Sequence, residues 1–133
     1  MEENKIDQPE FSVEDLRQYF RFLFPIKQMY KWLTYSQPNL KKDKNSTECS
    51  EYFYKREFSF TLPGDIYCRY NCFTNMEEFH EHLIKESPIK IDIGAVYNMP
   101  PRNHSSVDSG SFRPVSKELV FDIDISDYDD VRS

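Results

Sequence analysis

The sequence predicts an α+β fold, in which helices pack on a mixed or mostly antiparallel sheet. Apolar residues recur at steps of three and four over residues 13–33 and 76–83, which is typical of helices, and at steps of two over 58–70 and 89–93, which is typical of strands. A Pro-Gly-Asp turn at 63–65 divides the first alternating run, as expected of a hairpin. With 133 residues, of which 16% are aromatic, the chain can form one modest domain with a sizeable core.

Charge and cysteine content narrow the possible classes. The net charge of −6 argues against a broad basic surface that binds nucleic acid nonspecifically, but it does not exclude an enzyme whose metal site is acidic. The cysteines Cys49, Cys68 and Cys72 leave one unpaired and form no C-x-x-C metal pattern, which favours a reduced intracellular compartment. No apolar run reaches the ~18–20 residues needed to span a bilayer, and the first residues do not resemble a signal peptide.

Three helices are expected, and each has a start signal. The segment Ser12–Asp15 is a capping box before the first apolar stripe, and Pro25 can be the first residue of the second helix. The segment Thr74–Glu77 is a capping box for the third helix, which Pro88 ends. Residues 36–50 are rich in Lys, Asn and Ser and lack periodicity, so we expect a mobile insertion loop there.

The hairpin separates apolar from polar side chains if its loop pairs Leu62 with Ile66. The remaining pairs expected in this register are Phe60 with Cys68, Phe58 with Tyr70, Thr61 with Tyr67, Ser59 with Arg69, and Glu57 with Asn71. Glu57, Tyr67 and Arg69 then share the polar face of the sheet. They can form a binding site, or Glu57 and Arg69 can form a cross-strand ion pair that only solubilises the sheet.

A further strand is expected from the strict alternation over residues 89–93, which continues to Tyr97. Lys90 and Asp92 lie on the same face of this strand, and Gly94 can allow another backbone to approach closely. The Pro-, Ser- and Asn-rich residues 98–116 are expected to form a long loop.

The last strand is expected over Leu119–Ile125, where Asp122 and Asp124 share one face. Two carboxylates this close repel each other, and one stays protonated unless a cation neutralises both. A divalent metal such as Mg²⁺, which prefers oxygen ligands, suits this pair. The alternative is that both aspartates line the solvated face of an edge strand, and the D-x-D pattern alone leaves the two readings open.

Five stretches, taken in order along the chain, carry a resemblance to a known family. They are Tyr19–Pro25, Lys55–Thr61, Asp65–Tyr70, Lys90–Tyr97 and Glu118–Asp124. Together they resemble the small, catalytic subunit of eukaryotic DNA primases. The similarity extends from Phe11 to Arg132, and residues 36–50 depart from it as an insertion would.

The resemblance implies a partial archaeo-eukaryotic primase fold and the synthesis of short RNA primers from ribonucleoside triphosphates on single-stranded DNA. It implies nucleotidyl transfer with Mg²⁺ or Mn²⁺, and Asp122 and Asp124 match the family's catalytic, metal-binding aspartates. The residues that match its nucleotide and primer site are Glu57, Tyr67, Arg69, Lys90 and Asp92. The implied partners are the primase large subunit and DNA polymerase alpha, the implied location is the nucleus, and no membrane association is expected.

Three elements of the family have no counterpart in the sequence: a cysteine-rich zinc element, a Ser-Arg-His motif that binds triphosphate, and a third metal-binding aspartate. We therefore expect the chain, residues 1–133, to correspond to the N-terminal part of the catalytic domain, cut after the first metal-binding strand, and to make no primers alone. One alternative is a noncatalytic interaction module that binds the large subunit. Another is a metal-dependent nuclease, against which the hairpin and the Lys90–Tyr97 match argue.

Overall fold

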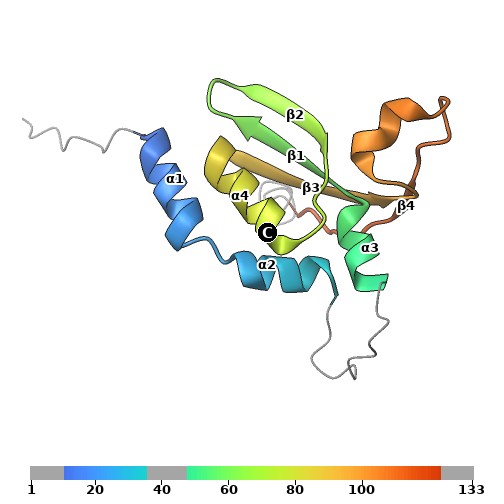
Figure 1. The fold of residues 1–133 in the computed structure, drawn as a ribbon, viewed down its shortest axis with the longest axis horizontal. Coiled ribbons are helices and arrows are strands. Elements are labelled where there is room, and N and C mark those ends of the chain that lie inside the picture. Colours follow the sequence, from blue (N-terminus) through green and yellow to red (C-terminus); the bar gives the residue numbers. More distant parts are fainter. Residues whose placement is uncertain (1–10, 36–47, 124–133) are drawn as a thin grey trace, which may run out of the picture.

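The computed structural model describes residues 11–35 and 48–123 (Figure 1). Its helices are α1 (Val13–Phe22), α2 (Ile26–Leu33), α3 (Glu48–Tyr54) and α4 (Met76–Glu86). Its strands are β1 (Arg56–Leu62), β2 (Ile66–Asn71), β3 (Lys90–Tyr97) and β4 (Pro114–Ser116), and a 3-10 helix, η1, spans Pro101–Ser106. Within the described residues the strands form one antiparallel sheet in the order β2-β1-β3-β4, so the α+β prediction is confirmed.

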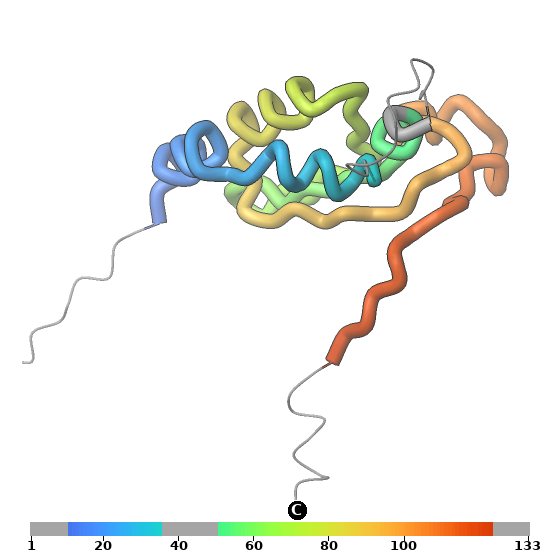
Figure 2. Tube along the Cα trace, turned by 90° about the horizontal axis from the view of Figure 1, so that it is seen from below, coloured from blue at the N-terminus to red at the C-terminus, as the bar shows by residue number. Residues whose placement is uncertain are grey.

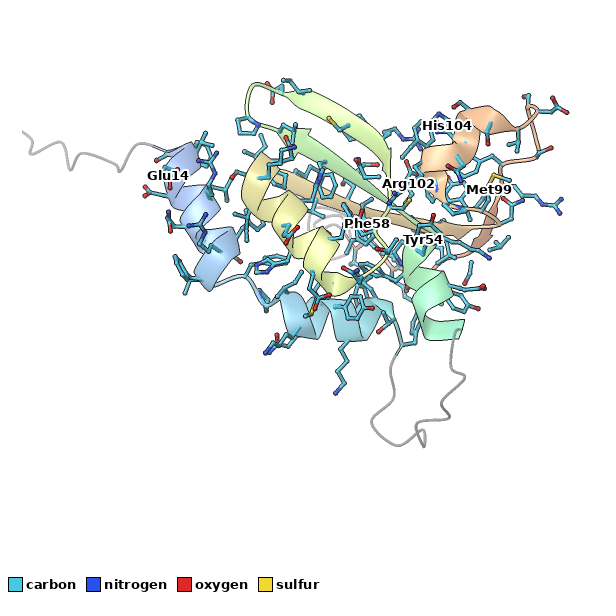
Figure 3. The ribbon with its side chains drawn as sticks, viewed as in Figure 1. Glu14, Tyr54, Phe58, Met99, Arg102 and His104 are labelled. Carbon is cyan, nitrogen blue, oxygen red and sulfur yellow. The ribbon has the colours of Figure 1, made fainter. Side chains whose placement is uncertain are left out.

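The helices α1, α2 and α4 lie on one side of the sheet, and α4 contacts both of the others (Figures 1 and 2). Phe58 and Phe60 of β1 point into this layer and are fully buried. The ring of Phe58, which Figure 3 labels, points toward this layer. It packs against Phe79 of α4 with 4.8 Å between ring centroids. Burying an aromatic or aliphatic side chain of this size stabilises the fold by about 1.5–3 kcal/mol, so this aromatic cluster holds the helices on the sheet.

Two helix starts depend on side-chain caps. Ser12 caps α1 as predicted, and its Oγ accepts a hydrogen bond from the Asp15 amide at 3.3 Å. The cap of α4 is Asn75 rather than the predicted Thr74, and its Oδ1 accepts from the Glu78 amide at 2.8 Å. Glu78 in turn accepts from the backbone amide of Thr74 at 2.7 Å. The N-cap therefore lies one residue later than the sequence pattern placed it, because Asn is as good a cap as Thr, and Glu78 binds the amide of the residue before the cap.

The hairpin register is correct near the turn and wrong beyond it. Leu62 pairs with Ile66, Thr61 with Tyr67 and Phe60 with Cys68, as predicted, but Phe58 then pairs with Asn71 instead of Tyr70. One extra residue of β2 lies between these last two pairs, so the strand contains a β-bulge. Tyr70 has a positive φ of 61°, which the bulge requires and which a tyrosine rarely adopts.

Two predicted loops contain regular structure. The loop expected over 36–50 lies outside the described residues over 36–47, and its last residues begin α3, whose Phe53 joins the core. The loop expected over 98–116 contains η1 and β4. Arg102 holds η1 against the body of the protein, because its guanidinium donates to the Cys72 carbonyl at 2.6 Å and lies 5.6 Å from the ring centre of Tyr54 (Figure 3).

The strand predicted over Leu119–Ile125 is not formed in its described part. The backbone over 117–123 has no regular structure and leads away from the sheet (Figure 2). Its apolar side chains are exposed: Leu119, Val120, Phe121 and Ile123. A β-branched segment becomes a strand only when a neighbour completes its backbone hydrogen bonds, and β4 reaches only to Ser116. In the part of the chain that the structure describes, no helix is long and apolar enough to cross a membrane.

Candidate functional site

The face of the sheet opposite the helices carries a cluster of polar side chains, called here the polar face. It consists of Glu57, Ser59, Thr61, Tyr67, Arg69, Lys90 and Asp92. Pairing of Thr61 with Tyr67 and Lys90, and of Ser59 with Asp92, brings three strands together on this face. The structure therefore brings together the five residues that the sequence analysis assigned to a nucleotide and primer site.

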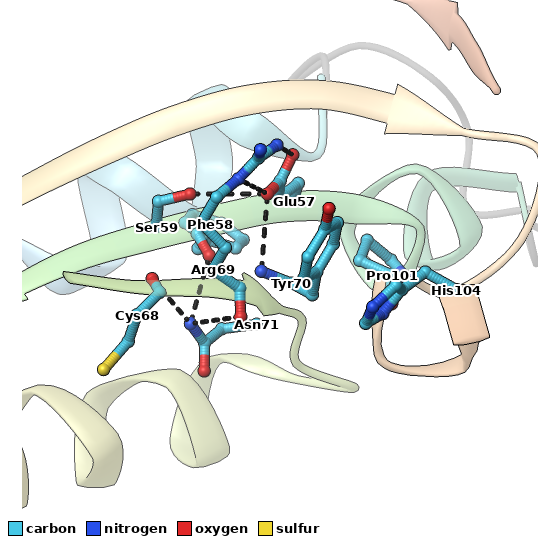
Figure 4. Close-up of polar contacts among 9 residues, drawn as sticks. All are labelled: Glu57, Phe58, Ser59, Cys68, Arg69, Tyr70, Asn71, Pro101 and His104. Atoms are coloured by element: carbon cyan, nitrogen blue, oxygen red, sulfur yellow. Dashed lines mark hydrogen bonds and ion pairs between the residues drawn. The ribbon is translucent and has the colours of Figure 1, made fainter. Parts of the chain in front are cut away.

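Glu57 and Arg69 form the central ion pair of the polar face (Figure 4). The guanidinium donates two hydrogen bonds to the carboxylate, Nε to Oε1 at 3.0 Å and Nη2 to Oε2 at 3.2 Å. Bidentate pairs of this kind fix the plane of the guanidinium as well as its position. The Glu57 side chain is only 5% exposed while that of Arg69 is 46% exposed, so a buried acid holds a cation that faces solvent. These hydrogen bonds raise the pKa of Arg69 above its usual value.

The β-bulge explains why Glu57 is so well fixed. Because the bulge removes Tyr70 from the strand pairing, its backbone amide is free to donate to Glu57 Oε1, at 3.3 Å (Figure 4). The Ser59 hydroxyl donates to the same oxygen at 3.4 Å. The buried carboxylate therefore accepts hydrogen bonds from three residues, which offsets the cost of removing its charge from water.

Gly94 of β3 lies directly beside Glu57. A Cβ at this position would be 2.9 Å from the Glu57 carbonyl oxygen and 3.1 Å from the Glu57 Cβ. Such distances are too short for any other residue without a shift of the backbone, so only glycine fits here. The predicted close approach of another backbone at Gly94 is confirmed.

Lys90 and Asp92 add a second ion pair at the edge of the polar face. Their Nζ and Oδ1 atoms are 3.2 Å apart, and the two side chains are 65% and 38% exposed. An exposed pair of this kind contributes about 0–1 kcal/mol to stability, so either group can exchange its partner for a ligand at little cost. Tyr67 is also exposed and lies on the same face. The polar face thus presents two cations, two carboxylates and one phenol.

An aromatic stack lies beside this face, and the sequence analysis missed it. Tyr70 stacks on His104 of η1 with 3.6 Å between ring centres, and Tyr97 stacks on Phe112 at 4.0 Å. The Arg69 guanidinium lies 4.8 Å from the Tyr70 ring centre. A hollow of about 510 Å³ next to Glu57 is lined by Gly94, Ala95, Tyr97 and residues 114–117. The stack depends on the conformation of Tyr70 at the bulge, which no local sequence signal indicates.

The two predicted metal ligands do not form part of the polar face in the described residues. Asp122 is exposed in the irregular segment after β4, and Asp124 lies outside the described residues. Among residues 11–35 and 48–123, no three His, Cys, Asp or Glu side chains group together in a way that could hold a metal. The metal-binding role of Asp122 and Asp124 therefore stays a prediction, as does their placement on the same face as Glu57, Tyr67 and Arg69.

The chain is an α+β protein, because its sheet carries helices on one face. The other face carries charged side chains, of which Arg69 is held in a fixed orientation by Glu57. No protein-family model matches it. It is similar to curated proteins named DNA primase small subunit: 45% identical over 125 residues to that of Drosophila melanogaster, covering 94% of this chain and 26% of that protein. The identity is 42% over 120 residues to that of Schizosaccharomyces pombe, and 34% over 122 residues to that of Saccharomyces cerevisiae.

The chain is therefore a homologue of eukaryotic DNA primase small subunits, as the resemblance predicted. It spans about a quarter of the length of these relatives, between 24% and 27%. The similarity covers 90–94% of the chain, which includes the polar face.

Proposed function

We propose that the chain is part of the catalytic subunit of a DNA primase, an enzyme that synthesises short RNA primers on single-stranded DNA from ribonucleoside triphosphates. The observation that carries this proposal is the similarity to several primase small subunits over nine-tenths of the chain. The polar face supports it, because the residues that the family resemblance assigns to nucleotide binding lie together there. The proposed setting is the nucleus, with a primase large subunit and DNA polymerase alpha as partners.

In this proposal the polar face positions the incoming nucleotide and the primer. Arg69 supplies a cation whose orientation is set before the ligand binds, because two hydrogen bonds to the buried Glu57 carboxylate hold the guanidinium. Preorganised charges of this kind stabilise developing negative charge without having to reorient during the reaction. Lys90 can leave Asp92 to contact a phosphate, and Tyr67 presents a hydroxyl and a ring to a ribose or base.

Asp122 and Asp124 are proposed to hold the divalent cations, because two carboxylates supply the oxygen ligands that Mg²⁺ and Mn²⁺ prefer. Bound there, the metal would activate the primer hydroxyl and neutralise the triphosphate. The chain's own contribution is to bind and orient the nucleotide on the polar face. Positioning of this kind is a large part of catalysis in phosphoryl transfer.

The test is a chimaera in which this chain replaces the matching segment of the Drosophila melanogaster primase small subunit. We expect the chimaera to synthesise primers on single-stranded DNA. Asp122→Asn or Asp124→Asn should lower the rate by about three orders of magnitude, since each removes a charged metal ligand. Asp108→Asn, in the exposed loop before β4, is the matched control and should retain full activity. A folded but inactive chimaera, or an active Asp122→Asn variant, would contradict the proposal.

A second candidate function is a noncatalytic module that binds the primase large subunit. The observation that favours it is the apolar surface of α1 and α2, where Phe22, Leu23 and Trp32 are 72%, 73% and 53% exposed. This candidate predicts that residues 1–133 bind a primase large subunit, and that Phe22→Ser with Leu23→Ser weakens binding by about tenfold or more. Asp122→Asn should leave that binding unchanged. Absence of binding by the folded chain would eliminate this candidate.

A further inference from the structure

A second ion pair joins the first residue of β1 to the segment after β4. Arg56 is buried completely, at 0% exposure, beside the core phenylalanines of the same strand. Its Nη2 donates to Glu118 Oε1 at 2.7 Å and its Nη1 to Glu118 Oε2 at 3.0 Å. Nη1 also donates to the Gly94 carbonyl at 3.0 Å, and the Tyr35 hydroxyl donates to the Glu118 carboxylate. This pair is called here the Arg56–Glu118 anchor.

The anchor holds Glu118 strongly because the buried guanidinium has few alternatives. A buried cation without a counter-charge is very unfavourable, and removing one partner of such a pair leaves the other uncompensated. Within the described residues, the Arg56 Nε has no hydrogen-bond partner, so the guanidinium depends on Glu118 and the Gly94 carbonyl. Displacing Glu118 would therefore leave the buried Arg56 guanidinium without a counter-charge, which is energetically unfavourable. The Glu118 side chain is 21% exposed, whereas residues 119–123 are all exposed.

Glu118 lies where the chain leaves the sheet. Strand β4 ends at Ser116, and the residues that follow Glu118 are exposed and irregular as far as residue 123. Asp122 comes four residues after the anchor and Asp124 six residues after it. Because a chain extends at most about 3.3–3.6 Å per residue, Asp122 stays within roughly 14 Å of the anchored backbone. The anchor thus sets the point from which the chain runs to Asp122.

The anchor is also tied to the polar face. Arg56 and Glu57 are consecutive, and Gly94 contacts both of them: its carbonyl accepts from Arg56, and its missing side chain makes room for Glu57. A shift of β3 at Gly94 would therefore move the Arg56–Glu118 anchor and the Glu57–Arg69 pair together.

We propose that Arg56 is a positioning residue, which acts through Glu118 to set where the segment that carries Asp122 leaves the sheet, relative to the polar face. This inference rests on the proposed function for its catalytic consequence. In this inference Arg56 does not itself bind nucleotide or metal. It holds Glu118, so the segment that carries Asp122 leaves the sheet from a defined point.

The test uses the primase chimaera and compares Arg56→Met, Arg56→Lys and the double variant Arg56→Met/Glu118→Met. The double variant removes both charges and keeps the side-chain volume, so it should recover the thermal stability that Arg56→Met loses. We expect its kcat to stay about 10- to 100-fold below that of the parent, as misplacement of reacting groups causes, with the nucleotide KM changed less than about twofold. Arg21→Met, an exposed arginine of α1, is the control and should change neither quantity.

Limited proteolysis supplies a readout that does not depend on activity. In the double variant, trypsin should cleave after Lys117 faster than in the parent, because Glu118 is no longer held, while cleavage after Lys85 of α4 should proceed at the parent rate. A double variant with recovered stability, normal kcat and unchanged cleavage after Lys117 would overturn the inference. If the double variant does not fold, Arg56→Lys decides alone: it keeps the charge but not the bidentate geometry, and normal kcat would overturn the inference.

The same experiment separates failure of the inference from failure of the proposed function. If the folded parent chimaera makes no primers, the proposed function is wrong, and the rate of cleavage after Lys117 still decides whether the anchor holds the chain at Glu118. If the parent is active, and Asp122→Asn abolishes activity while the double variant retains it, the proposed function stands and the positioning role of Arg56 is wrong.

Discussion

Arg56 and Glu57 are neighbours in β1, so their side chains leave the strand in opposite directions, and each forms a bidentate ion pair. Arg56 pairs with Glu118 in the segment after β4, and Glu57 pairs with Arg69 on the polar face. Both pairs join β1 to a segment distant in the sequence, one to the chain after β4 and the other to β2. Two consecutive residues therefore fix two parts of the proposed site through one strand.

Glu57→Gln should loosen Arg69 without unfolding the domain. The amide keeps the size of the side chain and can still accept from the Tyr70 amide, but it loses the charge that orients the guanidinium. We expect a loss of about 2 kcal/mol in the free energy of unfolding, typical of a charged hydrogen bond, and a higher nucleotide KM in the chimaera. Thermal unfolding and steady-state kinetics measure the two effects.

The control for this variant is Glu51→Gln, which removes the exposed partner of Lys55, 3.5 Å away. Its effect on stability should stay within about 0.5 kcal/mol, as for other surface pairs. Equal effects of the two variants would mean that burial of Glu57 has no energetic consequence.

Gly94→Ala should distort the polar face from the other side. The new methyl group would lie 2.9 Å from the Glu57 carbonyl oxygen, so β1 and β3 must separate. We expect destabilisation of about 1–3 kcal/mol, as for other overpacked sites, together with weaker nucleotide binding. Calorimetry of unfolding and of nucleotide binding in the chimaera would show both.

Gly64→Ala is the matched comparison, because nothing lies within 4 Å of its added methyl group and its cost comes only from a φ of 85°. This variant should lose stability but retain nucleotide affinity. Lost affinity in both glycine variants would show that the effect at Gly94 is not local.

Stability should fall in acid partly because of Glu118. The hydrogen bonds from Arg56 lower the pKa of Glu118 from its usual 4.5 to about 2. A carboxyl group whose pKa is lower in the folded state contributes stability that is complete above the unfolded pKa and is lost as the pH falls from about 4.5 to about 2. The melting temperature should therefore fall more steeply between pH 6 and pH 2.5 in the parent than in Glu118→Gln.

Glu118→Gln should also be less stable by about 3 kcal/mol at neutral pH, because it leaves the Arg56 guanidinium buried without a counter-charge. The pKa values of Glu14 and Glu78 are also lowered, by a hydrogen bond from Gln18 and from the Thr74 amide respectively. Both groups remain in the variant, so the difference between the two pH profiles isolates Glu118. Parallel profiles would contradict the assignment.

Asn75→Ala should destabilise α4 by about 1 kcal/mol, the usual cost of losing an N-cap. Thr74→Ala should cost less, because the backbone amide of residue 74 still donates to Glu78. Chemical denaturation of the two variants decides between the cap seen in the structure and the one that the sequence pattern favours. A larger effect at Thr74 would favour the latter.

The polar face could be predicted because period-two patterns and a short turn fix the register of a hairpin. Pairing Leu62 with Ile66 was enough to place Glu57 and Arg69 on one face and Phe58 on the other. The bulge could not be predicted, since Tyr70 has none of the properties that favour a positive φ. One feature of the sequence indicated the Arg56–Glu118 anchor. Arg56 alternates with Phe58 and Phe60 along the strand, so its side chain is expected to point toward the core as theirs do.

The predicted strand at Leu119–Ile125 shows the limit of local patterns. Its residues have high β-propensity, but strand formation depends on a partner elsewhere in space. The helix α3 was missed for a similar reason, because seven residues carry too little periodicity and their helix is stabilised by packing of Phe53 and not by propensity.

Residues 119–123 have unpaired backbone groups, and their apolar side chains are 65–82% exposed. Such a segment can form backbone hydrogen bonds with the edge strand of another molecule. Two copies of such a segment can pair with each other as readily as with a correct partner. Asp122 is the one charged side chain within this stretch, and in a stacked pair of copies it would lie near its own counterpart and repel it. We therefore expect the aspartate proposed for metal binding also to oppose self-association through this segment.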